Sequence, residues 1–245
     1  MINGWVKAKT KGKIAEIIDQ LSELTALVAL NAVYFKSQWK ESFLRQFTHD
    51  EPFHTSSGTT RNLPRMVQSG TYTYYENRHV QLARLPYRGN LSMYVVLPDG
   101  NDDSRRFRQE LTSDLWVSWL AKAKPMLGTI QLPRFRVDYQ AEVGIVLQRL
   151  GMERAFDPQR AQFEHVHTDR PPVWLNQVQH RSVVEVNEEG TEAAAATMSG
   201  LFCASAANYK PPKQFMMIVD HPFVIVIRDE TTKTILFMGW IGDPQ

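Results

Sequence analysis

The chain has 245 residues, 43% of them hydrophobic and 22% charged, and a formal net charge of +2. These values exclude a wholly disordered chain and give no general attraction to nucleic acid or to an anionic membrane surface. The single cysteine, Cys203, excludes an internal disulfide framework and a four-cysteine zinc site.

The sequence shows neither a membrane-spanning segment nor a signal peptide. No apolar run reaches the ~20 residues that a bilayer-spanning helix needs, and the longest, Gln214–Ile227, is interrupted by Asp220, His221 and Pro222. The first residues lack a basic head followed by an apolar stretch. We therefore expect a globular protein whose partners include neither nucleic acid nor a membrane.

The first segment, Ile2–Ile18, has the spacing of an amphipathic helix, with Asn3 as its expected N-cap. It carries four lysines, Lys7, Lys9, Lys11 and Lys13. They fit a polyanion-binding patch or a solvated helix face, and we favour the solvated face. The next segment, Leu24–Phe35, is apolar at nearly every position, which is typical of a strand covered on both faces.

The rest of the chain alternates between short strands, turns and helices. In chain order we expect hairpin strands at Thr71–Tyr75, Val80–Leu85 and Leu91–Leu97, two short helices in Asp102–Lys124, a β segment at Met126–Tyr139, a helix at Ala141–Leu150, a loop at Ala155–Pro172, a strand at Val173–Glu189, and a final hairpin of Gln214–Arg228 and Thr234–Ile241. No internal repeat or Gly/Ser linker divides the chain, so the pattern predicts one mixed α+β domain.

The segment Val184–Tyr209 differs from the rest, because Gly190 follows a clear strand and a run of small residues comes next. Alanine favours a helix. As a strand, the segment would place small side chains on one face, at Thr191, Ala193, Ala195 and Thr197, and that face would fit between other strands. A segment that suits both states meets the requirement of a conformational switch. A flexible surface loop is the alternative.

The run Val186–Thr197 resembles the hinge of the reactive-centre loop of the serpins, the serine protease inhibitors. Similar matches to that family occur in order along the chain: Asn31–Lys36 with Trp39, Phe53-His54, Pro64–Met66, Leu85–Tyr87, Leu91–Met93 with Leu97-Pro98, Leu132–Phe135, His221–Phe223, and Phe237–Gly239 with Pro244. The resemblance implies a partial serpin fold of mixed β-sheets A, B and C with helices, as a single domain over 1–245 with an exposed reactive-centre loop at about 188–209.

The resemblance also implies a mechanism. A serpin is a suicide substrate: a target serine protease cleaves the loop and forms a covalent acyl complex, and the loop then inserts into sheet A as a new strand. The implied hinge consists of Glu188, Glu189, Gly190, Thr191, Glu192, Ala193, Ala194, Ala195, Ala196 and Thr197. Bulky or charged inward residues would slow insertion, and the four inward residues here are small, so we expect an inhibitor.

The family's usual spacing from Gly190 places the reactive bond at Ala204–Ser205. A small residue at this bond suits elastase-like or subtilisin-like proteases, whose shallow pockets reject larger side chains. The stretch from Ser205 to His221 is longer than in many members, so Cys203, Ala206 and Ala207 remain alternatives for the bond. We interpret Cys203 as a small loop residue; the alternative is an exposed thiol whose oxidation would alter inhibition.

The resemblance implies three further contacts in sheet A. Arg134 and Glu188 should form an ion pair at the end of the sheet. The imidazole of His180 should bond across the sheet to Asn31. Trp39 should pack beneath the hinge and resist premature opening.

Other chemistry has less support in the sequence. Ser199-Gly200 lacks the Gly-x-Ser-x-Gly pattern of a nucleophile elbow, and a hydrolase that uses Ser205 is a weak alternative. His165, His167 and Asp169 fit exposed loop residues better than a zinc site. We therefore expect no enzyme, no cofactor and no metal.

The matches begin at a helix that lies in the middle of other serpins. We expect the isolated chain to be unstable, or to need the missing N-terminal segment as a partner. The family resemblance also implies an extracellular location. The alternatives to an inhibitor are a non-inhibitory serpin-fold binding or carrier protein and an inactive fragment.

Overall fold

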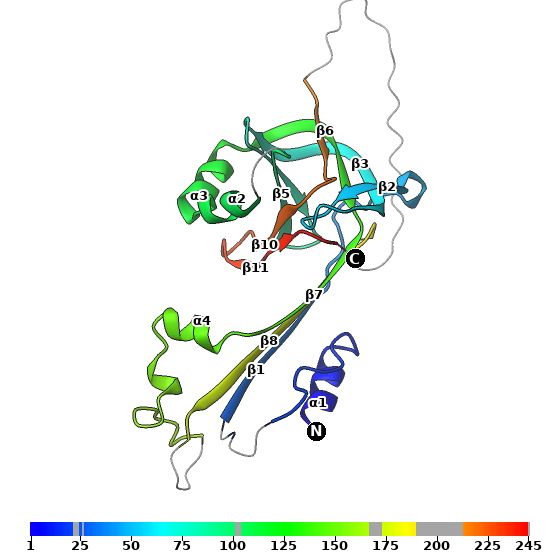
Figure 1. The fold of residues 1–245 in the computed structure, drawn as a ribbon. Helices are drawn as coiled ribbons and strands as arrows, with labels where there is room; N and C mark the ends of the chain where they lie inside the picture. Colours follow the sequence, from blue (N-terminus) through cyan, green and yellow to red (C-terminus); the bar gives the residue numbers. More distant parts are fainter. Residues whose placement is uncertain (22–24, 26, 101–103, 167–172, 190–212, 245) are drawn as a thin grey trace, which may run out of the picture. The chain divides into compact units, whose positions relative to one another are not determined.

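The computed structural model describes residues 1–21, 25, 27–100, 104–166, 173–189 and 213–244 (Figure 1). The chain forms two compact units, Met1–Phe35 with Val137–Val184 and Lys36–Arg136 with Glu185–Gln245. Two strands, β7 (Phe135–Glu142) and β8 (Leu175–Val186), contain residues of both units. The expected hinge therefore follows a strand that continues from the first unit into the second.

The first unit contains helix α1 (Ile2–Lys9) and a three-stranded sheet in the order β1-β8-β7, where β1 spans Leu27–Phe35. Strands β1 and β8 are parallel, and Asn31 pairs with His180 in their register. The small core of this unit consists of Val6, Ile14, Ile17 and Val183.

Four expectations for this unit are wrong in part. Helix α1 ends at Lys9, because Lys11 and Gly12 adopt positive φ angles of 54° and 80°. Asn3 lies inside the helix rather than at its cap; its amide accepts hydrogen bonds from the backbone N–H groups of Ile17 (3.1 Å) and Ile18 (3.2 Å). It therefore holds the segment after the helix against α1.

Strand β1 is not covered on both faces, since Phe35 is its single buried residue in the part of the chain that the structure describes. The later helix α4 spans Gly144–Arg149 and begins after the predicted start at Ala141, because β7 continues to Glu142. As expected, α4 is followed by Gly151, which has a φ of 101°. The short 3₁₀ turn Arg154–Phe156 follows α4.

The second unit is built on an eight-stranded sheet. Its order is β11-β10-β5-β4-β3-β6-β9, with β2 paired to β3. The strand bounds are β2 His49–His54, β3 Thr60–Glu76, β4 Val80–Pro86, β5 Leu91–Pro98, β6 Lys124–Pro133, β9 Phe215–Ile218, β10 Phe223–Asp229 and β11 Ile235–Ile241; the 3₁₀ turn Arg45–Phe47 precedes β2. The hairpin strands expected between Thr71 and Leu97 are confirmed, because β3 pairs antiparallel with β4 and β4 pairs antiparallel with β5.

Helices α2 (Ser104–Glu110) and α3 (Ser113–Lys122) confirm the two predicted short helices. The side chain of Thr112 caps α3 by accepting a hydrogen bond from the backbone N–H of Leu115. Three aromatic side chains of these helices, Phe107, Trp116 and Trp119, pack on valine, leucine and tyrosine side chains of β4, β5 and β10. The helices therefore cover one face of this part of the sheet (Figure 1).

The final predicted hairpin is correct only for β10 and β11, which pair antiparallel. Strand β9 instead pairs parallel with β6, from Gly128 opposite Phe215 to Gln131 opposite Ile218. Pro222 lacks an N–H group, and the chain turns between Val219 and Pro222 rather than continuing as one strand. This turn places β9 and β10 at different positions in the sheet.

Candidate functional site: the hinge cluster

The residues that follow β8 are held by a group of side chains that we call the hinge cluster. It consists of Trp39, Phe43, Thr48, Arg134, Asn187, Glu188 and Glu189, all in the second unit. Backbone hydrogen bonds run from the N–H of Phe43 to the carbonyl of Glu188 (2.8 Å) and from that of Trp39 to the carbonyl of Glu189 (3.2 Å). The chain therefore leaves β8 along the segment 39–43.

Glu188 is the buried charge of the cluster, with a side chain 3% exposed. Its Oε1 accepts hydrogen bonds from Arg134 Nη2 at 2.5 Å and from Thr48 Oγ1 at 2.9 Å. The ion pair expected between Arg134 and Glu188 is thus present. Arg134 lies on the solvent side of the pair, since its side chain is 47% exposed.

These contacts keep Glu188 ionised. Burial by itself raises the pKa of this carboxyl, because a buried charge loses hydration. Hydrogen bonds from Arg134, from the backbone N–H of Glu188 and from Thr48 outweigh burial, so the pKa lies below its ordinary value. A negative charge at the start of the hinge is therefore stable at neutral pH.

Trp39 supplies the apolar part of the cluster. It is 1% exposed and stacks on Tyr87, with ring centroids 4.3 Å apart and planes 6° from parallel. Phe43 meets the same ring edge-on at 6.0 Å. The indole Nε1 donates a hydrogen bond to the backbone carbonyl of Asn187 at 2.9 Å. Trp39 therefore lies where the resemblance places it, against the start of the hinge.

Glu189 lies at the edge of the cluster. Its carboxylate pairs with Arg45 at 2.7 Å, and the Arg45 side chain is 74% exposed. An ion pair this exposed contributes about 0–1 kcal/mol to stability. Glu188 and Glu189 are therefore adjacent in sequence, but we expect Glu188 to contribute more to stability.

The expected hydrogen bond between His180 and Asn31 is not present. Their strands place the two residues side by side, but no hydrogen bond joins their side chains among the described residues. The ring of His180 lies 6.4 Å from that of Tyr139 on β7, and Asn31 is exposed. An exposed amide forms hydrogen bonds with water that are as favourable as one with an imidazole. A bond between Asn31 and His180 would therefore add little stability.

Several expected site residues lie outside the described residues. They are the hinge residues Gly190 to Thr197, the reactive bond Ala204–Ser205 with its alternatives Cys203, Ala206 and Ala207, and two members of the weak metal cluster, His167 and Asp169. In the part of the chain that is described, no three His, Cys, Asp or Glu side chains form a group that would hold a metal ion. The roles of the loop residues therefore stay predictions.

Strand β9 is the described segment that follows residues 190–212. Phe215 stacks on Tyr74 at 3.7 Å and is 5% exposed. Its ring covers Gly128, where an added Cβ would lie 2.2 Å from it. The amine of Lys213 forms an ion pair of 2.9 Å with Glu76. We did not predict this anchor; a glycine within a strand, Gly128, was the available signal of a close approach.

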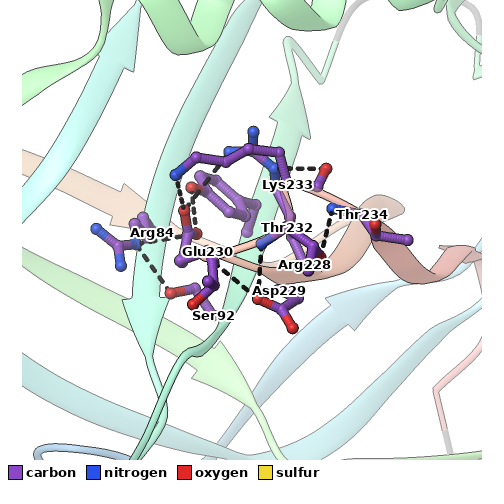
Figure 2. A network of polar contacts seen from close by, with 10 residues as sticks. Arg84, Ser92, Arg228, Asp229, Glu230, Thr232, Lys233 and Thr234 are labelled. Carbon is purple, nitrogen blue, oxygen red and sulfur yellow. Dashed lines mark hydrogen bonds and ion pairs between the residues drawn. The ribbon is translucent and has the colours of Figure 1, made fainter.

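A second polar cluster surrounds Glu230, just after β10, and Figure 2 shows Arg84 and Lys233 directed toward it. Its carboxylate accepts a hydrogen bond from the hydroxyl of Tyr94 at 2.6 Å and is 3.3 Å from Nε of Arg84. Burial by itself raises the pKa of Glu230, but the hydrogen bond from Tyr94 and the neighbouring cations lower it overall. The cluster holds the β10–β11 turn against β4 and β5, and we assign it a structural role.

Comparison with known proteins decides the family. A family model described as serpin (serine protease inhibitor) matches residues 1–244. The chain belongs to the serpin family. The recognition made from the hinge motif is therefore confirmed, and so is the fold class of a partial serpin fold.

Curated relatives of this serpin include antithrombin-III of Mus musculus, 34% identical over 99% of this chain and 52% of the relative. Serpin B8 of Homo sapiens is 37% identical over 99% of this chain and 65% of the relative. Leukocyte elastase inhibitor of Equus caballus is 34% identical over 99% and 65%. This serpin chain thus spans about half to two thirds of the length of these relatives.

Solved structures also support membership of the serpin family. The serpin chain matches the thermophilic serpin tengpin in its native state with a TM-score of 0.85 and 26% identity, over 99% of this chain and 62% of the other. It also matches human thyroxine-binding globulin in complex with its hormone, with a TM-score of 0.85 and 25% identity over 100% and 63%. No described helix is long and apolar enough to cross a membrane.

Proposed function

We propose that this serpin inhibits a serine protease as a suicide substrate, with Ala204–Ser205 as the cleaved bond and Glu188–Thr197 as the hinge. The observation that carries the proposal is the hinge cluster. Arg134 and Thr48 hold the carboxylate of Glu188. After Glu189 and Gly190 the hinge continues with the small inward residues Thr191, Ala193, Ala195 and Thr197, which favour insertion. The contact with Glu188 stabilises the start of the loop in one state, and insertion has to break it.

Insertion also needs a place in the sheet next to β8, the strand that leads into the hinge. Both edges of β8 are occupied, by β1 and by β7. The β7 side carries a bidentate ion pair from Arg181 to Asp138 (2.8 and 2.9 Å) and a hydrogen bond of 3.1 Å from the N–H of Val178 to Glu142. On the β1 side, a side-chain bond of 3.2 Å, from the N–H of Leu27 to Asn176, supplements the ladder in the part of the chain that the structure describes. We therefore propose that β1 and β8 separate to admit the loop.

The proposed partner is an elastase-like or subtilisin-like protease, because Ala204 is small. The relatives support an inhibitor of this kind, since one of them is named leukocyte elastase inhibitor. The extracellular location implied by the family resemblance stays a prediction.

The test is to mix the protein with pancreatic elastase and with subtilisin and to separate the products by denaturing gel electrophoresis. An SDS-stable complex, with the protease joined through an ester to the loop, is the expected result. Cleavage at residues 203–207 without any complex would overturn the proposal. Mass spectrometry of the released C-terminal fragment identifies the bond.

A matched pair of variants tests insertion. Ala195→Arg places a charged side chain on the inward face of the hinge, and Ala196→Arg places the same side chain on the outward face. We expect Ala195→Arg to be cleaved without complex formation and Ala196→Arg to form the complex. Equal behaviour of the two variants would contradict insertion as a strand.

A non-inhibitory carrier is the second candidate, favoured by the likeness to thyroxine-binding globulin in complex with its hormone. This candidate predicts that cleavage of the loop yields no complex with any protease tested. It also predicts that a bound hydrophobic molecule raises the melting temperature, because a ligand that binds only the folded state stabilises it. Neither Arg variant of the hinge would then change ligand binding.

A further inference from the structure

The turn between β9 and β10 carries a histidine with two acceptor partners. The Nδ1 of His221 lies 2.7 Å from Asp220 Oδ1, and Nε2 lies 2.8 Å from the backbone carbonyl oxygen of Pro98, at the end of β5. A carbonyl oxygen and an ionised carboxylate only accept hydrogen bonds, and a neutral imidazole has one N–H. Both bonds therefore exist together when the imidazole carries a proton on each nitrogen.

The surrounding backbone connects this histidine to β9. Val219, next to Ile218 at the end of β9, donates its N–H to the carbonyl of Gln131 on β6 (2.9 Å), and the N–H of His54 on β2 donates to the carbonyl of Asp220 (2.7 Å). Strand β9 pairs with β6 over four residues and lies at the end of the sheet order. His221 lies three residues after Ile218, the last residue of β9, and adds a contact to β5 just beyond the end of this short strand.

A cavity of about 380 Å³ adjoins His221. Its walls include Glu76, Arg78, Asp99, Met216, Ile218 and His221, so it lies between the β3–β4 turn and β9. Two contacts also join these parts: Lys213 pairs with Glu76, and Gln81 donates a hydrogen bond to the backbone carbonyl of Met216. Phe215 and Met217 anchor β9 in the core, so we expect loss of the histidine contact to loosen the end of β9 near Ile218, where the cavity adjoins the strand.

The charged groups around His221 favour its protonated form. Asp220 contacts it directly, and Asp99 faces it from the turn after β5. Arg65 of β3 acts on Asp220. Glu76 and Arg78 line the cavity from the β3–β4 side, and Arg78 donates a hydrogen bond to the ring of His79 at 2.7 Å.

The pKa directions agree with this arrangement. Burial by itself lowers the pKa of His221, but the hydrogen bonds with Asp220 and the Pro98 carbonyl and the charges of Asp220 and Asp99 raise it above its ordinary value. The hydrogen bond from His221, together with its charge, lowers the pKa of Asp220, although burial alone would raise it.

We propose that protonated His221 is a pH-dependent clamp that holds β9, the strand that follows loop residues 190–212, against the end of β5. When His221 loses its proton, one of its two hydrogen bonds is lost and β9 opens more often. A histidine with a raised pKa stabilises the folded state fully below its ordinary pKa of about 6.5, and this contribution disappears as pH rises through the raised value. The clamp is therefore closed in mildly acidic solution and open in alkaline solution. The clamp does not rest on the proposed function.

The experiment measures hydrogen exchange of the β9 amides between about pH 5.5 and pH 9, corrected for the intrinsic pH dependence of exchange. We expect β9 opening in the unmodified protein to rise about tenfold over this range, the size of one charge-assisted hydrogen bond. His221→Gln should open β9 at every pH. His221→Arg keeps a permanent cation and should protect β9 at every pH, and His79→Gln, in the turn between β3 and β4, should behave like the unmodified protein.

A second measurement detects the protonation state of His221 directly and does not depend on how the variants fold. In ¹⁵N-labelled protein, both ring nitrogens of His221 should carry a proton at pH 6, with a titration midpoint above that of exposed histidines. Opening of β9 that does not change with pH, or a midpoint below about 6.5, would overturn the proposal. Because β9 opening is measured without a protease, failure of the clamp is distinguishable from failure of the inhibitory function.

Discussion

At the scale of single residues, Glu188 receives contacts from three separate parts of the chain. Arg134 and Thr48 bind its carboxylate, and the N–H of Phe43 binds its carbonyl. Its side chain is 3% exposed, so replacing it disturbs hydrogen bonds that are shielded from water on the Glu188 side. The contribution of Glu188 to stability should therefore exceed that of an ordinary surface carboxylate.

The first prediction follows from this burial. We expect Glu188→Gln to lower the free energy of unfolding by about 1–3 kcal/mol at pH 7. The pKa of Glu188 is lowered in the folded state, so its contribution is complete above its ordinary pKa of 4.5 and is lost as pH falls through the lower folded value. The difference between variant and unmodified protein should therefore shrink below pH 4.5. Urea unfolding at several pH values measures it.

Glu189→Gln is the matched control, because Glu189 is the neighbouring residue and its partner Arg45 is 74% exposed. We expect a loss of less than about 1 kcal/mol for this variant. Equal losses for the two variants, or a difference that stays constant down to pH 3, would contradict the account of Glu188.

At the scale of elements, β9 depends on the absence of a side chain at Gly128. An added Cβ would lie 2.2 Å from the ring of Phe215, which stacks on Tyr74. We expect Gly128→Ala to displace β9 and to lower the free energy of unfolding by about 1–3 kcal/mol. Gly70, the β3 partner of Gly128, is the control, since its added Cβ would meet Tyr72 at an ordinary 3.7 Å. Gly70→Ala should leave exchange of the β9 amides unchanged, and a similar effect of both variants would refute the close packing.

Trp39 connects the segment before β2 to the start of the hinge. Trp39→Phe keeps an aromatic ring against Tyr87 but removes the hydrogen bond from Nε1 to the carbonyl of Asn187. We expect a loss of about 1 kcal/mol and faster exchange of the Phe43 amide, which bonds to Glu188. Trp5→Phe, at a position that is 60% exposed, is the control and should change neither quantity. Unchanged exchange at Phe43 in Trp39→Phe would rule out a role for the indole in holding the hinge.

At the scale of the whole molecule, much apolar surface on two sheets is uncovered in the described chain. Strand β1 has one buried residue, and Ile235, Leu236 and Met238 of β11 are 40%, 48% and 51% exposed. Exposed apolar surface forgoes about 25 cal/mol of stabilisation per Å². We therefore predict that residues 1–245 by themselves unfold at a low temperature and bind a hydrophobic dye before they melt.

Calorimetry and dye fluorescence of residues 1–245 test this prediction. A polypeptide that covers these strands should raise the melting temperature and abolish dye binding, because binding to the folded state stabilises it. A cooperative melt of residues 1–245 at the temperature of full-length relatives, without dye binding, would contradict the prediction.

The sequence by itself determined the features that depend on local pattern. Alternating side chains and turn residues predict the hairpins of β3, β4 and β5, and helical spacing predicts α2 and α3. The ordered motifs identify the family, and through it the contact of Arg134 with Glu188. These features could be predicted because either a periodic pattern of side chains or a resemblance to known serpins marks them.

Tertiary structure decided the contacts between residues that no pattern links. Asn3 binds the backbone of Ile17 and Ile18 instead of capping its helix, and β9 pairs with β6 rather than extending β10. The two acceptors of His221 lie one residue and 123 residues away along the chain. The direction of a hydrogen bond and the protonation of a side chain depend on atoms that folding brings together, and for that reason the sequence could name the hinge but not the contacts that hold β9.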